Sequence, residues 1–292
     1  MNRILKDLIK LLNLETIEDN LFRGESRDLG GKSVFGGQVI GQALVAATRT
    51  VEGEVLPHSL HAYFLRPGDM NKPIVYEVDR VRDGRSFQTR RVQAIQSGQP
   101  ILSMMTSFQK PEAGLEHQTP MLDVAAPETL KPLTALHSQW LDEVPDVHER
   151  THHALTREVA IEFKPVQPHN PLKPQVLPPQ QAIWFRAAGK LPDDPLLHHC
   201  VLAYATDFHL LTTALRPHAK TWYSHHMAVA SIDHAIWFHR PIRVDDWLLY
   251  CMDSPTAQSA RGLSRGLIYD RAGHLVASVI QENLMREVPP RA

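Results

Sequence analysis

The sequence predicts an α+β fold of two tandem units, each an antiparallel sheet wrapped around a central helix. An internal repeat, two helical segments rich in small apolar residues, and strands of alternating polarity together support this fold class. The chain has 292 residues, of which 43% are apolar, and this is enough for a packed core.

The internal repeat is clearest in the stretches HSLHAYFLRPG and IDHAIWFHRPI. Both contain Phe-x-Arg-Pro, and Phe238 follows Phe64 at an offset of 174 residues. The same offset takes Tyr76 to Tyr250. Upstream, EDNLFRG resembles AIWFRAAG, so each copy begins with a similar strand. We therefore expect the two copies to fold alike.

A helix of small residues follows the first strand of each copy, over 36–50 and 196–215. Both segments are apolar around much of the helix circumference, which is typical of a buried helix. Asp194 as N-cap and Pro195 at the first helical position mark the start of the second helix, and Pro217 lies beyond its end. A curled antiparallel sheet around each helix accounts for its burial.

The strands after each helix are also similar in the two copies. In both, a polar-leaning strand leads into a turn at Gly98 or Gly273 and then into a more apolar strand. We predict an N-terminal unit over 1–112, a Pro-rich structured connector over 113–179 and a C-terminal unit over 180–292.

The connector lacks a clean hydrophobic periodicity and contains the Pro-rich run QPHNPLKPQVLPPQQ. Its segments LTALHSQWLDEV and ERTHHALTREVAI are compatible with either helix or strand. Trp140, Ile161 and Phe163 indicate that the connector packs against the rest of the protein.

Composition argues against several classes of protein. The net charge is −1 and no long basic run occurs, so a nucleic-acid partner is not expected. The two cysteines, Cys200 and Cys251, are too few for a disulfide framework or a cysteine-rich metal site. The glycines of FGGQVIGQ fit neither the dinucleotide-binding nor the P-loop spacing, and no cofactor is expected.

Histidine is frequent, with 17 residues, but the spacing of the histidines does not predict a metal site. Adjacent histidines point apart, and the His-x-x-His pair lies at a strand entry rather than on a helix. The close pairs are His58 and His61, His152 and His153, His198 and His199, and His225 and His226.

The N-terminal segment MNRILKDLIKLLNLETIEDN has the pattern of an amphipathic helix, not of a signal peptide. We expect this helix to dock on the protein's own core, with a membrane-surface role as the weaker alternative. No segment is apolar enough to span a membrane, and the C-terminal VPPRA is neither a peroxisomal nor an ER-retention signal. A cytoplasmic protein without stable membrane association is expected.

Asp207 is the first candidate functional residue, because it lies within the apolar stretch LAYATDFHLLTTAL. Read as one helix, this stretch places Asp207 among Ala203, Leu210 and Leu211. Burial of an unpartnered carboxylate costs several kcal/mol. Two interpretations stay open: Asp207 caps or pairs locally or lies on a narrow solvated stripe, or it is a working acid or base.

Two further polar residues lie on predicted strands. Gln281 continues an apolar face of the last strand, HLVASVIQENLM, either as a strand-end residue that meets water or as a fixed hydrogen-bonding group. Ser231, in MAVASIDHAIWF, shares a strand face with Asp233 if the alternation is regular. A serine in a strand carries little information by itself.

The glycines Gly36, Gly37 and Gly41 open the first central helix. We favour a role in close packing of helix on sheet. The alternative is that backbone N–H groups at the helix start face an oxyanion or phosphate.

Ser264 stands in GLSRG, which matches the Gly-x-Ser-x-Gly nucleophile elbow of α/β-hydrolases. That motif requires a strand, a strained turn and a helix. Here the surrounding residues alternate as in an antiparallel strand, so a chance match is the favoured interpretation.

Several segments together resemble the acyl-CoA thioesterase II family over nearly the whole chain. They are FRGES, VFGGQVIGQAL, HSLHAYFLRPGD, DGRSFQTRRVQAIQ, QPHNPL, AYATDF, IDHAIWFHRP, LLYCMDSP and ARGLSRGLIYDRAGHLVASVIQE. The resemblance implies the double hotdog fold. It also implies a catalytic set of Asp207, Ser231 and Gln281, with serine where bacterial relatives often have threonine.

The implied reaction is hydrolysis of acyl-CoA to a free fatty acid and CoA. Asp207 would take a proton from the attacking water while Ser231 and Gln281 hold the water and the carboxylate in line, without an acyl-enzyme. The implied partner is the acyl-CoA substrate, and a homo-oligomer, a dimer or tetramer, is expected because the sheets can extend or stack across a second copy.

Three alternatives remain open. A hotdog enoyl-CoA hydratase has an Asp-x-Asn-x-x-His motif, but the run from Asp207 to Thr212 lacks both the Asn and the His. A serine hydrolase would use Ser264. A non-catalytic acyl-CoA-binding hotdog protein would have a degenerate site, against which the Asp, Ser and Gln set argues.

Overall fold

The computed structural model describes residues 2–224 and 226–288. Its first half contains α1 (Arg3–Leu12), β1 (Glu15–Glu18), β2 (Leu21–Gly24), α2 (Gly36–Thr48), β3 (Leu56–Phe64), β4 (Ile74–Asp83), β5 (Phe87–Gln96) and β6 (Gln99–Gln109). The connecting segment contains the 3₁₀ helix η1 (Pro127–Thr129), α3 (Leu133–Glu143), α4 (Glu149–Thr156) and β7 (Ile161–Pro165). The second half contains β8 (Gln180–Ala187), α5 (Pro195–Thr206), α6 (Leu210–Leu215), η2 (Arg216–His218), β9 (Met227–Ser231), β10 (Asp233–Phe238), β11 (Leu248–Gln258), β12 (Arg261–Tyr269) and β13 (Leu275–Glu287).

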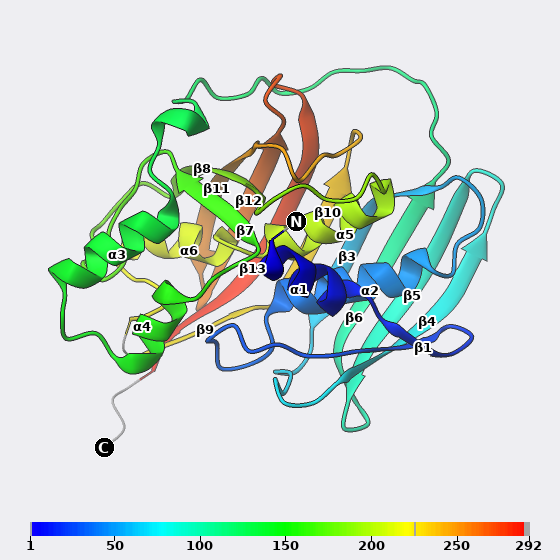
Figure 1. The fold of residues 1–292 in the computed structure, drawn as a ribbon, viewed down its shortest axis with the longest axis horizontal. Coiled ribbons are helices and arrows are strands. Elements are labelled where there is room, and N and C mark those ends of the chain that lie inside the picture. The colour runs from blue at the N-terminus through cyan, green and yellow to red at the C-terminus, as the bar shows by residue number, and fades with distance from the viewer. Residues whose placement is uncertain (1, 225, 289–292) are drawn as a thin grey trace.

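The described strands form one antiparallel sheet, which curves behind the helices (Figure 1). Its order is β1-β2-β4-β5-β6-β3-β10-β13-β12-β11-β8-β7, and β9 pairs with β13 beside this path. The first half contributes β2-β4-β5-β6-β3, and the second half contributes the equivalent strands in reverse order, β10-β13-β12-β11-β8. The predicted α+β fold of two tandem units is therefore confirmed.

The two units meet at an approximate twofold axis between β3 and β10. His61 lies opposite Ala235 in this antiparallel pair, and these two residues are 174 positions apart, the offset of the sequence repeat. A residue that pairs with its own repeat equivalent must lie on the axis. The internal repeat is thus a structural repeat, and the two sheets are joined through their equivalent strands.

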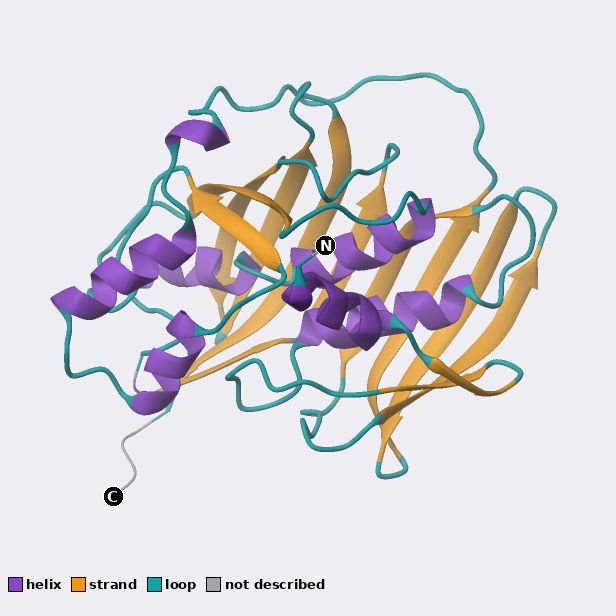
Figure 2. Ribbon diagram, viewed as in Figure 1, coloured by secondary structure: helices purple, strands orange, loops and turns teal. Residues whose placement is uncertain are grey.

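The central helices α2 and α5 lie side by side on one face of the sheet (Figure 2). A Cβ atom on Gly37 would overlap the Tyr204 carbonyl oxygen, and one on Gly41 would stand 3.3 Å from the Cys200 carbonyl oxygen. The expectation that these glycines pack a helix on the sheet holds for Gly36, where a Cβ would overlap the Phe64 ring of β3, but Gly37 and Gly41 pack against the other central helix. They allow the backbones of the two helices to approach each other.

The repeat tyrosines attach each central helix to its own sheet. The Tyr76 hydroxyl on β4 donates to Gln42 of α2 at 2.7 Å, and the Tyr250 hydroxyl on β11 donates to the Thr206 carbonyl of α5 at 3.1 Å. Both side chains are fully buried. The Tyr250 bond holds the last residue of α5, immediately before Asp207.

The N-terminal helix α1 docks on the core as predicted. Leu5, Leu8 and Leu12 are buried, and the Asn2 side chain caps the helix by accepting from the Leu5 N–H. In the described part of the chain, no helix combines the length and the apolar character that crossing a membrane requires.

The second central helix is shorter than expected. The sequence predicted one helix over 196–215, but α5 ends at Thr206 and α6 begins at Leu210. His209 between them adopts a left-handed backbone conformation, with φ of 72°, which stops the helix. The predicted start is confirmed, since Asp194 accepts from the Leu196 N–H and Pro195 is the first helical residue.

The connector is ordered and packed, as predicted from its large apolar residues. Trp140, Ile161 and Phe163 are buried. The segment LTALHSQWLDEV forms α3, most of ERTHHALTREVAI forms α4, and β7 adds to the sheet beside β8. The helices α3 and α4 contact each other and close one side of the cavity described below (Figure 1).

Candidate active site

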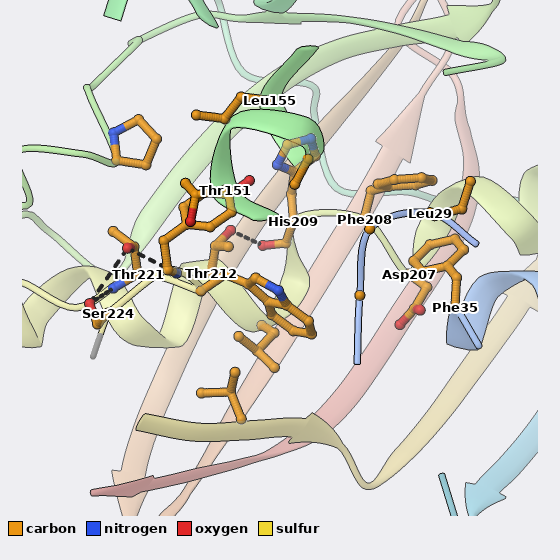
Figure 3. Close-up of a pocket in the computed structure, with 18 of the residues that line it drawn as sticks. Leu29, Phe35, Thr151, Leu155, Asp207, Phe208, His209, Thr212, Thr221 and Ser224 are labelled. Atoms are coloured by element: carbon orange, nitrogen blue, oxygen red, sulfur yellow. Dashed lines mark hydrogen bonds between the residues drawn. The ribbon is translucent and has the colours of Figure 1, made fainter. Parts of the chain in front are cut away.

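A cavity of about 1740 Å³ lies where the two units and the connector meet. Its wall includes the start of α2, the segment between α5 and α6, and side chains of α3 and α4. Asp207 lies at one end of the cavity beside Phe35 and Phe208, and Thr221 and Ser224 lie at the other (Figure 3). The cavity is large enough for an extended ligand.

Asp207 is the C-cap of α5 rather than a residue inside a helix. The break at His209 opens this position, and three side chains from two elements support the break: Gln181, Thr212 and Thr213 all donate to the His209 carbonyl. The Asp207 side chain is consequently only partly buried and faces the cavity.

Two donors hold the Asp207 carboxylate. The Gly37 N–H at the start of α2 donates to one carboxylate oxygen at 2.8 Å, and the Ser231 hydroxyl donates to the other at 3.3 Å. A carboxylate at the C-terminus of α5 is disfavoured by that helix, whereas the N-terminus of α2 favours it. The Gly37 N–H thus faces a carboxylate of the protein itself, and the interpretation that these N–H groups face an oxyanion or phosphate stays a prediction.

The surroundings of Asp207 raise its pKa above the ordinary value of 3.8. Loss of hydration on burial is the largest cause. The hydrogen bonds from Gly37 and Ser231 act in the opposite direction and are weaker, as does the nearby His234 when its ring is protonated. A carboxylate with a raised pKa is a better proton acceptor than an exposed one.

A bulge between β9 and β10 brings Ser231 to the site. Ser231 pairs with Asn283 of β13 and Ala235 pairs with Ile280, so three residues on one strand oppose two on the other. The expectation that Ser231 shares a face with Asp233 is therefore wrong. The bulge turns Ser231 and His234 toward the same neighbour on β13, and Asp233 turns away to accept from the Glu282 N–H.

Gln281 is fully buried on β13 and is a fixed hydrogen-bonding group, not a strand-end residue in water. Its Nε2 donates to the Ser231 hydroxyl at 3.0 Å and to the Asn283 side chain at 2.6 Å. Gln281 is not part of the cavity wall, so it reaches the cavity through Ser231. The structure thus brings the three predicted residues, Asp207, Ser231 and Gln281, into one hydrogen-bonded group.

Sequence reasoning missed three polar residues behind this group. His234, Thr206 and Asn283 are all fully buried and bonded to Gln281 or to one another. Asn283 could have been found from its position, because it continues the same strand face two residues after Gln281. His234 could not, because a regular strand does not place it beside Ser231.

Ser264 lies in the middle of β12 and not at a strand–turn–helix junction. It is fully buried, its hydroxyl donates to the Leu210 carbonyl at 2.8 Å, and it does not line the cavity. This geometry is not that of a nucleophile elbow. Ser264 instead ties β12 to the start of α6.

The histidine pairs do not converge on a common point in residues 2–224 and 226–288, where no three His, Cys, Asp or Glu side chains are arranged to hold a metal ion. Of the pairs singled out from the sequence, His225 lies outside the described residues. His198 and His199 are buried in α5.

Comparison with known proteins agrees with the fold. The profile of the acyl-CoA thioesterase family matches residues 137–284, and that of the acyl-CoA thioesterase N-terminal domain matches residues 25–109. The chain is 43% identical to acyl-CoA thioesterase 2 of Haemophilus influenzae, over 98% of this chain and 99% of that protein. It is 42% identical to human acyl-coenzyme A thioesterase 8, over 96% of this chain and 88% of that protein.

Solved structures give the same result. An acyl-CoA thioesterase II from Mycobacterium marinum superposes with a TM-score of 0.78 at 40% identity, over 96% of this chain and 98% of that one. A hot dog fold protein from Alicyclobacillus acidocaldarius superposes with a TM-score of 0.77 at 17% identity, over 98% and 99% of the two chains, and it supports the fold alone.

The chain has the double hotdog fold and is a thioesterase of that fold. The chain belongs to the acyl-CoA thioesterase II family, and it is an acyl-CoA thioester hydrolase.

Proposed function

We propose that the chain hydrolyses fatty acyl-CoA with Asp207 as general base and without a covalent acyl-enzyme. The observation that carries this proposal is the Asp207 carboxylate in the wall of a large cavity, bonded to a hydroxyl that Gln281 holds from behind. A water that donates to Asp207 in this cavity is placed to attack a thioester carbonyl.

In the proposed reaction the water oxygen attacks the thioester carbonyl carbon while Asp207 takes the proton of that water. Collapse of the tetrahedral intermediate breaks the C–S bond, and the proton on Asp207 then leaves with the thiolate. Because a thiol has a pKa of about 8–9, its thiolate departs without a strong general acid. The reaction therefore asks little more of the protein than a base and correct positioning.

Ser231 and Gln281 have positioning roles in this proposal. The Gln281 amide uses both of its N–H groups, on Ser231 and on Asn283. It therefore orients the Ser231 hydroxyl, which in turn fixes the Asp207 carboxylate plane. From the sequence, Ser231 and Gln281 were expected to hold both the water and the carboxylate in line. This proposal keeps only the second role, and Gln281 acts on the carboxylate through Ser231.

Mass spectrometry of the intact protein during turnover tests the mechanism. The chain is mixed with a slowly hydrolysed acyl-CoA, quenched with acid and weighed while CoA is still being released. We expect no mass increase equal to the acyl group at any time, because water attacks directly. An acylated serine or aspartate that forms and decays at the turnover rate would contradict direct hydrolysis.

The dependence of the rate on pH follows from the raised pKa of Asp207. Asp207 works as a base only when ionised, so activity is lost as pH falls through its folded-state pKa. Since burial raises this pKa, we expect the acid limb of kcat/KM to have its midpoint above 3.8. His234 faces the same group, and burial lowers its pKa. A limb at or below 3.8 in rate measurements across this range would contradict the assignment.

We also propose that the chain works in the cytoplasm as a homo-oligomer, a dimer or tetramer. The outer face of the sheet offers a surface for a second copy, where Met105, His61, Ala235 and Ile280 lie in one row across four strands. Met105 is 42% exposed and Tyr63, on the same face, is 59% exposed. Light scattering of the purified chain measures the mass of the assembly directly.

A further inference from the structure

A chain of buried hydrogen bonds continues behind the proposed catalytic group. From Gln281 it runs to His234 at 2.5 Å, and from the other side of the His234 ring to the Thr206 hydroxyl at 3.0 Å. His234, Thr206 and Gln281 have no exposed surface. Because water does not reach these groups, each proton between them must be assigned to one of the two partners.

Asn283 fixes the orientation of the Gln281 amide. The Asn283 Nδ2 faces two backbone carbonyls, those of Gly262 at 3.3 Å and of Gln281 itself at 3.4 Å. Carbonyl oxygens only accept, so the amide nitrogen of Asn283 belongs on that side and its oxygen faces Gln281. The atom of Gln281 next to this oxygen must be the donor Nε2, and the Gln281 oxygen must therefore face His234.

The orientation of Gln281 in turn fixes the tautomer of His234. An amide oxygen only accepts, so the proton between the two groups is on Nδ1 of His234. Burial lowers the pKa of His234, which favours the neutral ring, so its Nε2 is an acceptor. The single proton of the Thr206 hydroxyl lies within reach of this Nε2 and of the Ala203 carbonyl, each at 3.0 Å. The donors of His234, Gln281 and Ser231 thus point one after another toward Asp207.

We propose that His234 is a positioning residue for thioester hydrolysis, which holds the Gln281 amide so that Gln281 orients Ser231 and Ser231 orients Asp207. The inference rests on the proposed role of Asp207 as the base. Loss of the Nδ1 donor leaves the Gln281 oxygen without a partner in a dry site. The amide then has reason to rotate, and the Ser231 hydroxyl loses its fixed direction.

The other half of the molecule shows that the fold does not require this histidine. In β10, β13 and β12, His234 lies beside Gln281, and Gln281 pairs with Ser264. In the equivalent strands β3, β6 and β5, Leu60 takes the place of His234, Thr106 that of Gln281 and Arg90 that of Ser264. Leu60 pairs with Thr106, and Thr106 pairs with Arg90.

Leu60 is fully buried at the position equivalent to His234. A leucine therefore fits at this point of the sheet, under the central helix. The polar chain is confined to the half that contains Asp207, which is expected if it serves the reaction rather than the fold.

A matched pair of variants tests the proposal. Asparagine and leucine have nearly the same shape, but in His234→Asn the Nδ2 group takes the place of the histidine Nδ1 donor, whereas H234L has no donor. We expect H234L to lower kcat for a fatty acyl-CoA about 100-fold, the scale of a misplaced catalytic group, with KM changed much less. We expect H234N to restore kcat to within a few-fold of the parent.

Each result separates the proposal from its alternatives. Equal losses in H234L and H234N would mean that only the ring volume matters, and a fully active H234L would mean that the donor is not needed; either result overturns the proposal. If Asp207→Asn keeps full activity, the proposed function fails first, whereas an inactive D207N with an active H234L leaves that function standing and removes only this inference.

A spectroscopic measurement on the parent chain does not depend on variants that fold. Nitrogen-15 shifts of the labelled imidazole rings distinguish a proton on Nδ1 from a proton on Nε2. We expect His234 to carry its proton on Nδ1 at neutral pH. A neutral ring with its proton on Nε2 would reverse the hydrogen-bond order and overturn the assignment.

Discussion

Replacement of Asp207 by asparagine is expected to lower kcat for acyl-CoA hydrolysis by on the order of 10³-fold. Asparagine has the shape of aspartate and its oxygen can still accept from the Gly37 N–H, but the amide takes no proton from water. Because the pKa of Asp207 is raised by burial, the neutral side chain should not weaken the fold. Release of the CoA thiol, followed in a folded variant, measures the effect.

Ser264→Ala is the matched control for this measurement. The Ser264 hydroxyl donates to the Leu210 carbonyl and lies outside the cavity wall, so kcat should stay near that of the parent. The loss of one buried hydrogen bond should lower the free energy of unfolding by about 1 kcal/mol. A collapse of activity in S264A, or full activity in a folded D207N, would instead favour a serine hydrolase mechanism.

Gly37→Ala is expected to lower the free energy of unfolding by about 3 kcal/mol, at the upper end of the range for overpacked sites. The added Cβ would overlap the Tyr204 carbonyl oxygen and stand 2.6 Å from a ring carbon of Phe35. A backbone oxygen cannot swing aside, so α2 must shift away from α5. The same shift moves the Gly37 N–H from Asp207, and activity should fall as well.

Denaturant unfolding and thioesterase rates of Gly37→Ala are best compared with Gly114→Ala. Gly114 has no atoms within 4 Å of its Cβ position and no left-handed φ, so alanine should change the free energy of unfolding by less than about 0.5 kcal/mol. A Gly37 variant as stable and active as the Gly114 variant would show that the two central helices separate at little cost.

The repeat was the most informative part of the sequence. Phe64 and Phe238, and Tyr76 and Tyr250, keep one spacing because equivalent strands and turns must have equal lengths in both units. That spacing led correctly to the paired units and the buried helices, and the amphipathic pattern led correctly to the docked α1. The boundaries at 112 and 179 stay a prediction.

The breaks in regular structure could not be predicted, because their causes lie far away in the chain. No glycine or proline marks the end of α5, and a histidine with φ of 72° is disfavoured locally. The His209 carbonyl accepts a hydrogen bond from Gln181 of β8. Helix propensities of the residues around His209 carry no information about this distant partner. The bulge before β10 likewise depends on the Asp233 side chain, which accepts from the Glu282 N–H on β13.

The candidate site was found through the resemblance, and its catalytic roles stay a prediction. Gln281 and Ser231 gave weak signals alone, since a strand residue becomes informative only when its neighbours are known. The bulge brings His234 to Gln281, so the chain behind the site is a product of the tertiary structure. Only Asn283 could have been predicted from the strand pattern, because it lies two positions after Gln281 on the same face.

The pairing of β3 with β10 has a consequence for how this molecule could diversify. In a symmetric homodimer every substitution occurs twice, so both copies of a site must change together. Here the two copies are joined in one polypeptide, and Arg90 can fill the place that Ser264 holds in the other copy. The first copy still contributes the Gly37 N–H to Asp207 of the second. Because the two copies share one polypeptide, each can change without the other, so that one can supply the proposed base and the other its support.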